Sequence, residues 1–167
     1  MMTTDLVAQA TLNSPLGPLL LGATERGLAY LWFVDPEYHA VNTLEAPENP
    51  RQRWIAQATE ELDGYWDGHC PPRFRVPLDL QGTAFQRAVW QALLEVPPGR
   101  TSTYGSIARQ VGAPQAARAA GAAIGRNPVA IIVPCHRIIG SNGSLTGFAS
   151  GLPRKERLLQ LEGALLV

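Results

Sequence analysis

The first part of the chain alternates short apolar runs with turn residues. Three such runs cover residues 8–12, 19–23 and 28–34, and Gly or Pro stands in the segments between them. Short apolar runs bounded by turn residues are typical of strands, so we predict a small antiparallel meander. Residues 51–66 instead carry apolar side chains every three or four positions, which predicts a helix.

The second part has helical spacing and clear helix starts. Residues 70–80 contain several prolines and are predicted to be an extended linker. Thr83 and Gln86 then form a capping-box pattern at the start of an apolar stripe. A short helix over residues 104–111 and another over residues 115–124 are separated by a Gly-containing turn. Two helices joined in this way are a helix-turn-helix candidate.

The apolar run over residues 131–133 leads directly into Pro134. Proline donates no backbone hydrogen bond and biases the residue before it towards extended backbone. We therefore predict a buried strand that ends at Pro134. Beyond it, residues 141–144 are predicted to be a hairpin turn, and residues 154–162 a last helix.

Composition indicates an ordinary globular protein. The chain has 167 residues, of which 46% are hydrophobic and 17% charged, enough for one domain or two small ones. No apolar run is long enough to span a bilayer, and the N-terminus does not look like a signal peptide. Two cysteines, Cys70 and Cys135, make no disulfide framework. We expect a monomer in a reducing cytoplasm, with no membrane attachment.

The zero net charge conceals two halves of opposite sign. Residues 1–80 hold five basic and eleven acidic residues, a balance of −6, whereas residues 81–167 hold nine basic and three acidic ones, a balance of +6. Eight of the nine cations in the second half are arginine. Such segregation indicates a polyanionic partner on that side.

Cys135 is the candidate nucleophile, because His136 and Arg137 follow it at the end of the predicted strand. A thiol reacts as the thiolate, which a nearby base or positive charge favours. The alternative is a small core cysteine without chemistry. Neighbouring side chains on a strand point to opposite faces, so His136 would act through a water or be oriented by a distant carboxylate.

The second helix of the helix-turn-helix candidate consists mostly of Ala and Gly, with Arg118 as its single cation. A helix that reads base edges in the major groove normally exposes several Arg, Asn or Gln side chains. A smooth helix suits close approach to a narrow groove, held by phosphate contacts and insensitive to sequence. Tight packing between helices is the alternative explanation.

Taken together, these motifs resemble the O6-alkylguanine-DNA alkyltransferases. The matching segments are Gly82-Thr83-Ala84-Phe85-Gln86, Thr103-Tyr104-Gly105, Ala117-Arg118-Ala119, Asn127-Pro128, Pro134-Cys135-His136-Arg137, Gly147-Phe148 and Leu161-Glu162-Gly163, with a looser match at Ser14-Pro15-Leu16-Gly17. The resemblance implies an α+β protein of two domains. Residues 1–80 would form a ribonuclease-H-like domain with a small antiparallel sheet and a helix. Residues 81–167 would form a winged-helix-like domain with the helix-turn-helix.

The resemblance also implies a reaction. The Cys135 thiolate would attack the alkyl carbon on guanine O6, or less well on thymine O4, and the transfer would be irreversible and occur once per molecule. Glu162 would orient His136, which would draw the thiol proton through a water. Asn127 would order the backbone of the site. Neither a metal nor another cofactor is expected, since the first half offers only His39, His69 and Cys70 as candidate soft ligands.

The implied partner is double-stranded DNA, bound through the minor groove without sequence preference and with the alkylated base flipped out. Arg118 would fill the vacated space, and Tyr104 would push the phosphate and contact the flipped guanine. The carbonyls of Cys135 and Ile138 would accept from the guanine amino group, and the Ala149 N–H would donate to O6. The remaining DNA or substrate contacts implied by the resemblance are Arg137, Phe148, Ser150, Ala117 and Gly121.

Three positions depart from the family pattern. Phe148 stands where many members have tyrosine, and Ala130 and Ser150 stand where some have proline and glycine.

Other functions compete with the transferase. A damage sensor of related sequence would lack Cys135. A helix-turn-helix DNA-binding regulator with a structural cysteine would need a recognition helix with more side chains able to read base edges. A cysteine hydrolase using Cys135, His136 and Glu162 would turn over.

Overall fold

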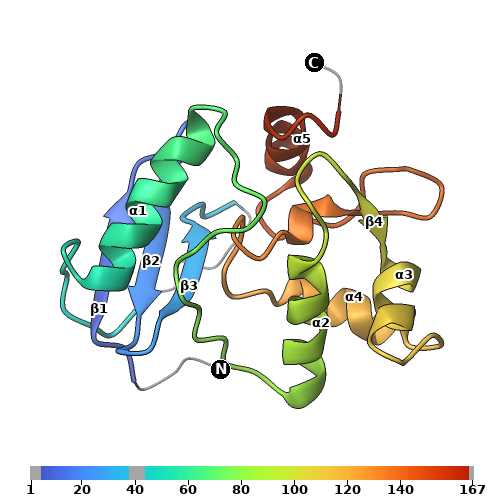
Figure 1. Cartoon of the computed structure of the whole chain (residues 1–167), viewed down its shortest axis with the longest axis horizontal. Helices are drawn as coiled ribbons and strands as arrows, with labels where there is room; N and C mark the ends of the chain where they lie inside the picture. Colours follow the sequence, from blue (N-terminus) through green and yellow to red (C-terminus); the bar gives the residue numbers. More distant parts are fainter. Residues whose placement is uncertain (1–4, 38–43, 166–167) are drawn as a thin grey trace.

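The computed structural model describes residues 5–37 and 44–165, which form an α+β protein (Figure 1). The predicted meander is confirmed as an antiparallel sheet of order β1-β2-β3, formed by Ala8–Leu12, Leu19–Ala23 and Leu28–Phe33. The predicted helix is confirmed as α1, Arg53–Trp66. It begins two residues later than the spacing suggested, because the Gln52 side chain accepts from the N–H groups of Trp54 and Ile55 and caps it.

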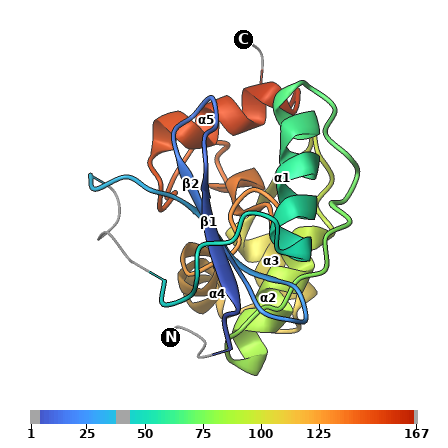
Figure 2. The ribbon, with the colours of Figure 1, turned by 90° about the vertical axis from the view of Figure 1, so that its left-hand side faces the viewer.

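One face of the sheet packs against α1, as the edge-on view in Figure 2 shows. The buried side of the helix consists of Ile55, Ala58, Leu62 and Tyr65. The register of β2 and β3 shifts between Gly22 and Ala23. Tyr30 and Trp32, two residues apart on β3, lie together on the face away from α1, where their rings meet edge to face at 5.1 Å.

The outer edge of β3 is occupied by two later segments of the chain. The linker pairs with its start, where Leu28 N–H donates to Pro77 O at 2.8 Å and Asp79 N–H to Leu28 O at 2.9 Å. Residues 128–130 pair with its middle, where Leu31 N–H donates to Pro128 O at 2.9 Å and Ala130 N–H to Leu31 O at 2.8 Å. Buried side chains of both halves form one continuous cluster, so the segment that leads to Cys135 is anchored on the sheet.

The second half carries α2, α3 and α4 (Figure 1), and the predicted helix-turn-helix is confirmed as α3 and α4. The bounds of its helices and short strands are α2 Ala84–Leu94, β4 Ser102–Thr103, α3 Tyr104–Gln110, α4 Ala117–Gly125, β5 Ile138–Ile139 and α5 Leu152–Leu161. The capping box of Thr83 and Gln86 is present at α2, and Thr103 caps α3. Trp90 Nε1 donates to Ala123 O at 2.8 Å and holds α4 on α2.

The predicted strand over residues 131–133 is wrong. These residues form tight turns, with Ile132 N–H donating to Ala130 O and Ile131 at a φ of 71°. A 3₁₀ turn, Cys135–Arg137, follows. The run is apolar because the two halves bury it between them, and a short apolar run by itself does not distinguish a buried strand from a buried turn.

The predicted turn at residues 141–144 forms, but it does not join two strands. Gly140 N–H donates to Ser144 O at 2.9 Å and closes the turn. The neighbouring strand β5 pairs in parallel with β4 instead. Among residues 5–37 and 44–165, no helix has the length and apolar character needed to cross a membrane.

Candidate active site

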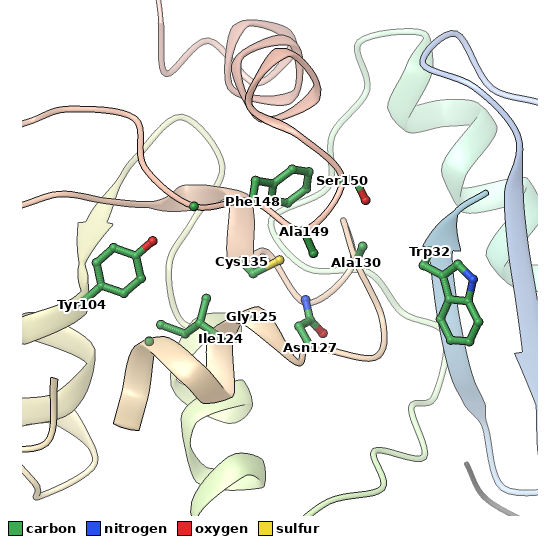
Figure 3. Close-up of a pocket in the computed structure, with 12 residues that line it drawn as sticks. Trp32, Tyr104, Ile124, Gly125, Asn127, Ala130, Cys135, Phe148, Ala149 and Ser150 are labelled. Carbon is green, nitrogen blue, oxygen red and sulfur yellow. The ribbon is translucent and has the colours of Figure 1, made fainter. Parts of the chain in front are cut away.

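A cavity of about 360 Å³ lies between the two halves of the chain, with Cys135 in its wall (Figure 3). Its lining comes from β3, α3, α4, the turns before Cys135 and the loop before α5. The lining residues are Trp32, Tyr104, Gly121, Ile124, Gly125, Asn127, Ala130, Cys135, Gly147, Phe148, Ala149 and Ser150. Most of this surface is apolar, and such a site suits an organic group better than an ion.

Cys135 is the first residue of the 3₁₀ turn, and its sulfur points into the cavity (Figure 3). Only 9% of the residue is exposed. Burial raises the pKa of the Cys135 thiol, while a hydrogen bond from Asn127 and the positive charge of Lys155 act in the opposite direction. The resting thiol therefore keeps its proton and needs a base before it can react.

A candidate base, His136, follows the thiol in the chain. His136 Nε2 and Glu162 Oε2 are 2.7 Å apart, and both side chains are fully buried. An ionised carboxylate only accepts hydrogen bonds, so Nε2 carries the proton and Nδ1 presents its lone pair. His136 Nδ1 is buried and makes no hydrogen bond within the described chain. Burial lowers the pKa of His136 although Glu162 opposes this, so the ring is neutral and able to accept a proton.

Glu162 is held by donors from three side chains, His136 and Arg137 of the 3₁₀ turn and Tyr65 of α1. Arg137 donates Nε to Oε1 at 2.8 Å and Nη2 to Oε2 at 3.0 Å. The Tyr65 hydroxyl, on α1, also donates to Oε2, at 2.7 Å. Burial alone would raise the pKa of Glu162, but hydrogen bonds and charges from His136 and Arg137 outweigh it and lower that pKa to about 2.

The position of Arg137 contradicts its expected contact with DNA. Only 4% of the residue is exposed, and its guanidinium lies on Glu162 and donates Nη1 to Val96 O at 2.7 Å. The turn that carries Cys135 points this side chain into the core, where it neutralises Glu162. Arg137 therefore supports the Glu162 carboxylate from inside the protein.

Asn127 braces the turns that precede Cys135. Its Nδ2 donates to Val133 O at 2.7 Å, and its Oδ1 accepts from Val129 N–H at 3.0 Å. These two bonds close the loop between the end of α4 and the thiol. The side chain thus fixes the backbone on which Cys135 is presented.

Lys155 is a component of the site that sequence reasoning missed. It is fully buried, and its Nζ donates to the carbonyls of Ile138, Thr146 and Gly147. Burial lowers its pKa to about 8. Lys155 ties the loop over the cavity to β5. The sequence feature that could have indicated its burial is its position three residues before Leu158, on the apolar stripe of the helix.

The residues expected to contact DNA lie on the other side of the cavity, on α3, α4 and the loop before α5. Arg118 is exposed near the start of α4, whereas Ala117 and Gly121 are half-buried. Tyr104 lies at the cavity, opposite Gly121, and its hydroxyl donates to Thr146 O at 3.2 Å. The outward face of α4 bears no large side chain except arginines at its two ends, Arg118 and Arg126.

The loop residues expected near the substrate, Phe148, Ala149 and Ser150, also line the cavity. Ile138 does not: its side chain is buried, and its carbonyl accepts from Lys155. Four lining residues were missed from the sequence: Trp32, Ile124, Gly125 and Gly147. Trp32 comes from β3, so nothing near it in the sequence indicates its place in the cavity wall.

Within residues 5–37 and 44–165, no group of three His, Cys, Asp or Glu side chains is placed to hold a metal ion. His69 and Cys70 are part of this range, but His39 lies outside the described residues. The absence of a metal site in the first half remains a prediction.

Two family models, which describe the two domains of one kind of protein, match most of this chain. Family models match residues 7–80 as the ribonuclease-like domain of 6-O-methylguanine DNA methyltransferase and residues 84–164 as its DNA-binding domain. The methylated-DNA–protein-cysteine methyltransferase of Methanosarcina acetivorans is 47% identical over 93% of this chain and 97% of its own length. That of Mycobacterium leprae is 50% identical over 91% of this chain and 90% of its own.

A solved structure, Mycobacterium tuberculosis OGT in complex with DNA, superposes with a TM-score of 0.86 and 44% identity, covering 95% of this chain and 94% of that one. Sequence and structure agree over nearly the full length. The chain therefore belongs to the 6-O-methylguanine DNA methyltransferase family.

Proposed function

We propose that this protein repairs DNA by direct reversal, taking the alkyl group of O6-alkylguanine onto Cys135 in a single, irreversible step. One observation carries the proposal: a buried cysteine faces an apolar cavity, and the next residue in the chain is a buried histidine that a carboxylate orients. The family relationship supplies the substrate class.

The reaction begins with removal of the thiol proton. His136 Nδ1 takes it through an intervening water, and Glu162 stabilises the imidazolium that forms. The Cys135 sulfur attacks the alkyl carbon, so an S–C bond forms and the C–O6 bond breaks. Guanine leaves with the electron pair on O6. Transfer of the proton from His136 to the leaving guanine then neutralises that charge.

The leaving guanine needs hydrogen-bond donors as its charge develops. The Ala149 N–H makes no hydrogen bond within the described residues and would donate to O6. The Cys135 carbonyl already accepts from Ile138 N–H, and the Ile138 carbonyl from Lys155. Each carbonyl has a second lone pair, with which it would receive the guanine amino group. Phe148 and Ser150 would contact the base and the alkyl group.

DNA would lie across α4, with its minor groove on the smooth outward face of that helix. Arg118 and Arg126 are exposed at the two ends of this face, where they would contact phosphates without reading sequence. Ala117 and Gly121 allow the close approach. When the target nucleotide flips into the cavity, Arg118 would leave its phosphate contact and fill the vacated space, and Tyr104 would lie beside the base. One protein monomer would act on one lesion.

Mass spectrometry of the intact protein and its peptides, after incubation with excess duplex containing O6-methylguanine, tests the proposal. We expect one added methyl group per molecule, located on Cys135, and no further turnover. A Cys135→Ser variant should bind the duplex but gain no mass. Lesion binding without methylation of the unmodified protein would indicate a damage sensor instead, and repeated demethylation of the duplex without lasting protein modification would indicate a hydrolase.

A further inference from the structure

Tyr65 is the only described residue of the first half whose side chain is hydrogen-bonded to the catalytic carboxylate. It lies on α1, 97 residues before Glu162, and its hydroxyl donates to Glu162 Oε2 at 2.7 Å. The residue is fully buried. Its ring packs edge to face on Trp66 at 5.1 Å and against Phe74 at 5.8 Å, so the hydroxyl has one fixed direction.

Three donors converge on the same oxygen. Glu162 Oε2 accepts from Tyr65, from His136 Nε2 at 2.7 Å and from Arg137 Nη2 at 3.0 Å, while Oε1 accepts from Arg137 Nε. A carboxylate oxygen has two lone pairs, so these donors compete. Each additional donor reduces the charge that Oε2 can offer to the proton on His136.

The competition matters because the strength of the His136 base depends on that charge. Protonation at Nδ1 creates an imidazolium, and Glu162 is the anion that stabilises it. A stronger Nε2–Oε2 bond makes His136 more basic, and a weaker one makes it less basic. Arg137 and Lys155 are the cations whose charge acts on the ring, and Cys70 lies 3.9 Å from Arg137 Nη2.

We propose that Tyr65 is a positioning residue of the alkyl-transfer site, whose hydroxyl donates to Glu162 Oε2 and weakens the hydrogen bond of that oxygen to His136, which helps to keep His136 neutral near physiological pH. The inference rests on the proposed function, because the base it describes serves the Cys135 thiol. Burial and the neighbouring Glu162 charge raise the pKa of Tyr65, so its hydroxyl remains a donor throughout the working pH range.

The structure therefore assigns part of the proton chemistry to the first half of the chain. The helix α1 packs on the sheet, and its last turn delivers one hydroxyl to the network behind the thiol. Replacing Tyr65 by Phe removes that hydroxyl and keeps the ring. The Arg137 guanidinium still donates to both oxygens of Glu162. The carboxylate therefore stays in position while the hydrogen bond between Oε2 and His136 Nε2 strengthens.

The test follows His136 directly and follows methyl transfer in parallel. The chain has three histidines, and ¹⁵N-labelled histidine allows the pKa of His136 to be measured by NMR in the wild type, Tyr65→Phe and Trp66→Phe. The Trp66→Phe variant is the matched control, since it disturbs the packing of the Tyr65 ring without removing a donor from Glu162. Rates of Cys135 methylation by the lesion duplex are measured across the same pH range.

We expect Tyr65→Phe to raise the pKa of His136 by about half a unit, and to lower the methylation rate below that pKa by about threefold, because more of the base is protonated there. Trp66→Phe should lower stability and leave both profiles unchanged. An unshifted His136 titration in Tyr65→Phe, or an equal shift in Trp66→Phe, would overturn the proposal. If the wild type is not methylated at all, the proposed function fails, and the NMR titration still decides the role of Tyr65.

Discussion

Replacing Glu162 by Gln should destabilise the protein strongly, because the carboxylate is the only anion within hydrogen-bonding distance of Arg137 among the described residues. The Arg137 side chain is 5% exposed and that of Glu162 is fully buried. Removing one partner of a buried ion pair leaves the other charge without compensation and typically costs about 3–5 kcal/mol. Total stabilities of single domains are about 5–15 kcal/mol, so the loss is measurable by urea unfolding at pH 7.

The same substitution should change how stability depends on pH. The pKa of Glu162 is lowered in the folded protein from 4.5 to about 2. A carboxylate with a depressed folded-state pKa stabilises the fold above its unfolded pKa, and this contribution is lost as pH falls towards the folded value. The difference corresponds to about 3 kcal/mol at neutral pH, of which about 2 kcal/mol should be gone at pH 3.

The Glu162→Gln variant lacks this carboxylate and should lose less stability than the wild type between pH 5 and pH 3. His136 has a lowered pKa, so both proteins should also lose stability as pH falls below its unfolded value of about 6.5. A double variant, Arg137→Met with Glu162→Gln, removes the uncompensated cation and should be more stable than Glu162→Gln alone. A free energy of unfolding of Glu162→Gln within about 1 kcal/mol of the wild-type value at pH 7 would contradict this role of the ion pair. A parallel loss of stability in the two proteins down to pH 3 would contradict it as well.

Three further outcomes are expected. In salt titrations followed by fluorescence anisotropy, Arg118→Ala should reduce the slope of log affinity for unmodified duplex by about one, whereas Arg51→Ala, in the acidic half, should not. Trp32→Ala should change the rate ratio of O6-benzylguanine to O6-methylguanine by about threefold or more, measured by peptide mass spectrometry; an unchanged ratio would remove Trp32 from the alkyl pocket. Lys155→Met should lower the urea-unfolding free energy by about 2–4 kcal/mol, because three carbonyls lose a charged donor whose own side chain is buried; a loss below about 1 kcal/mol would contradict that role.

Local patterns in the sequence predicted most of the elements. The strands of the meander, the capped start of α2 at Thr83 and the short helix begun at Thr103 follow from neighbouring residues alone. The segment before Cys135 was misassigned because burial by tertiary packing and burial in a sheet produce the same apolar run. Ile131 adopts positive φ there, which its side chain gave no reason to expect.

Residues of the site could be predicted from the sequence only where they belong to a motif of the family. Cys135, His136 and Glu162 were expected together from the family resemblance, and the structure places His136 and Glu162 in contact. Trp32 and Tyr65 reach the site from β3 and α1 through contacts between residues far apart in sequence. No local periodicity encodes such contacts. Arg137 was expected to contact DNA but points into the core, because neighbouring residues in a 3₁₀ turn point in different directions.

The pairing of residues 128–130 with β3 bears on the order in which the protein matures. Contacts between distant segments form late, because closing a long loop costs chain entropy before the contacts compensate for it. The backbone leading to Cys135 therefore reaches its final path only after the sheet exists and the distant segment has docked on Leu31. Until then the thiol lacks its base and its cavity. A reagent that can be consumed only once is thereby kept inactive while the chain is still folding.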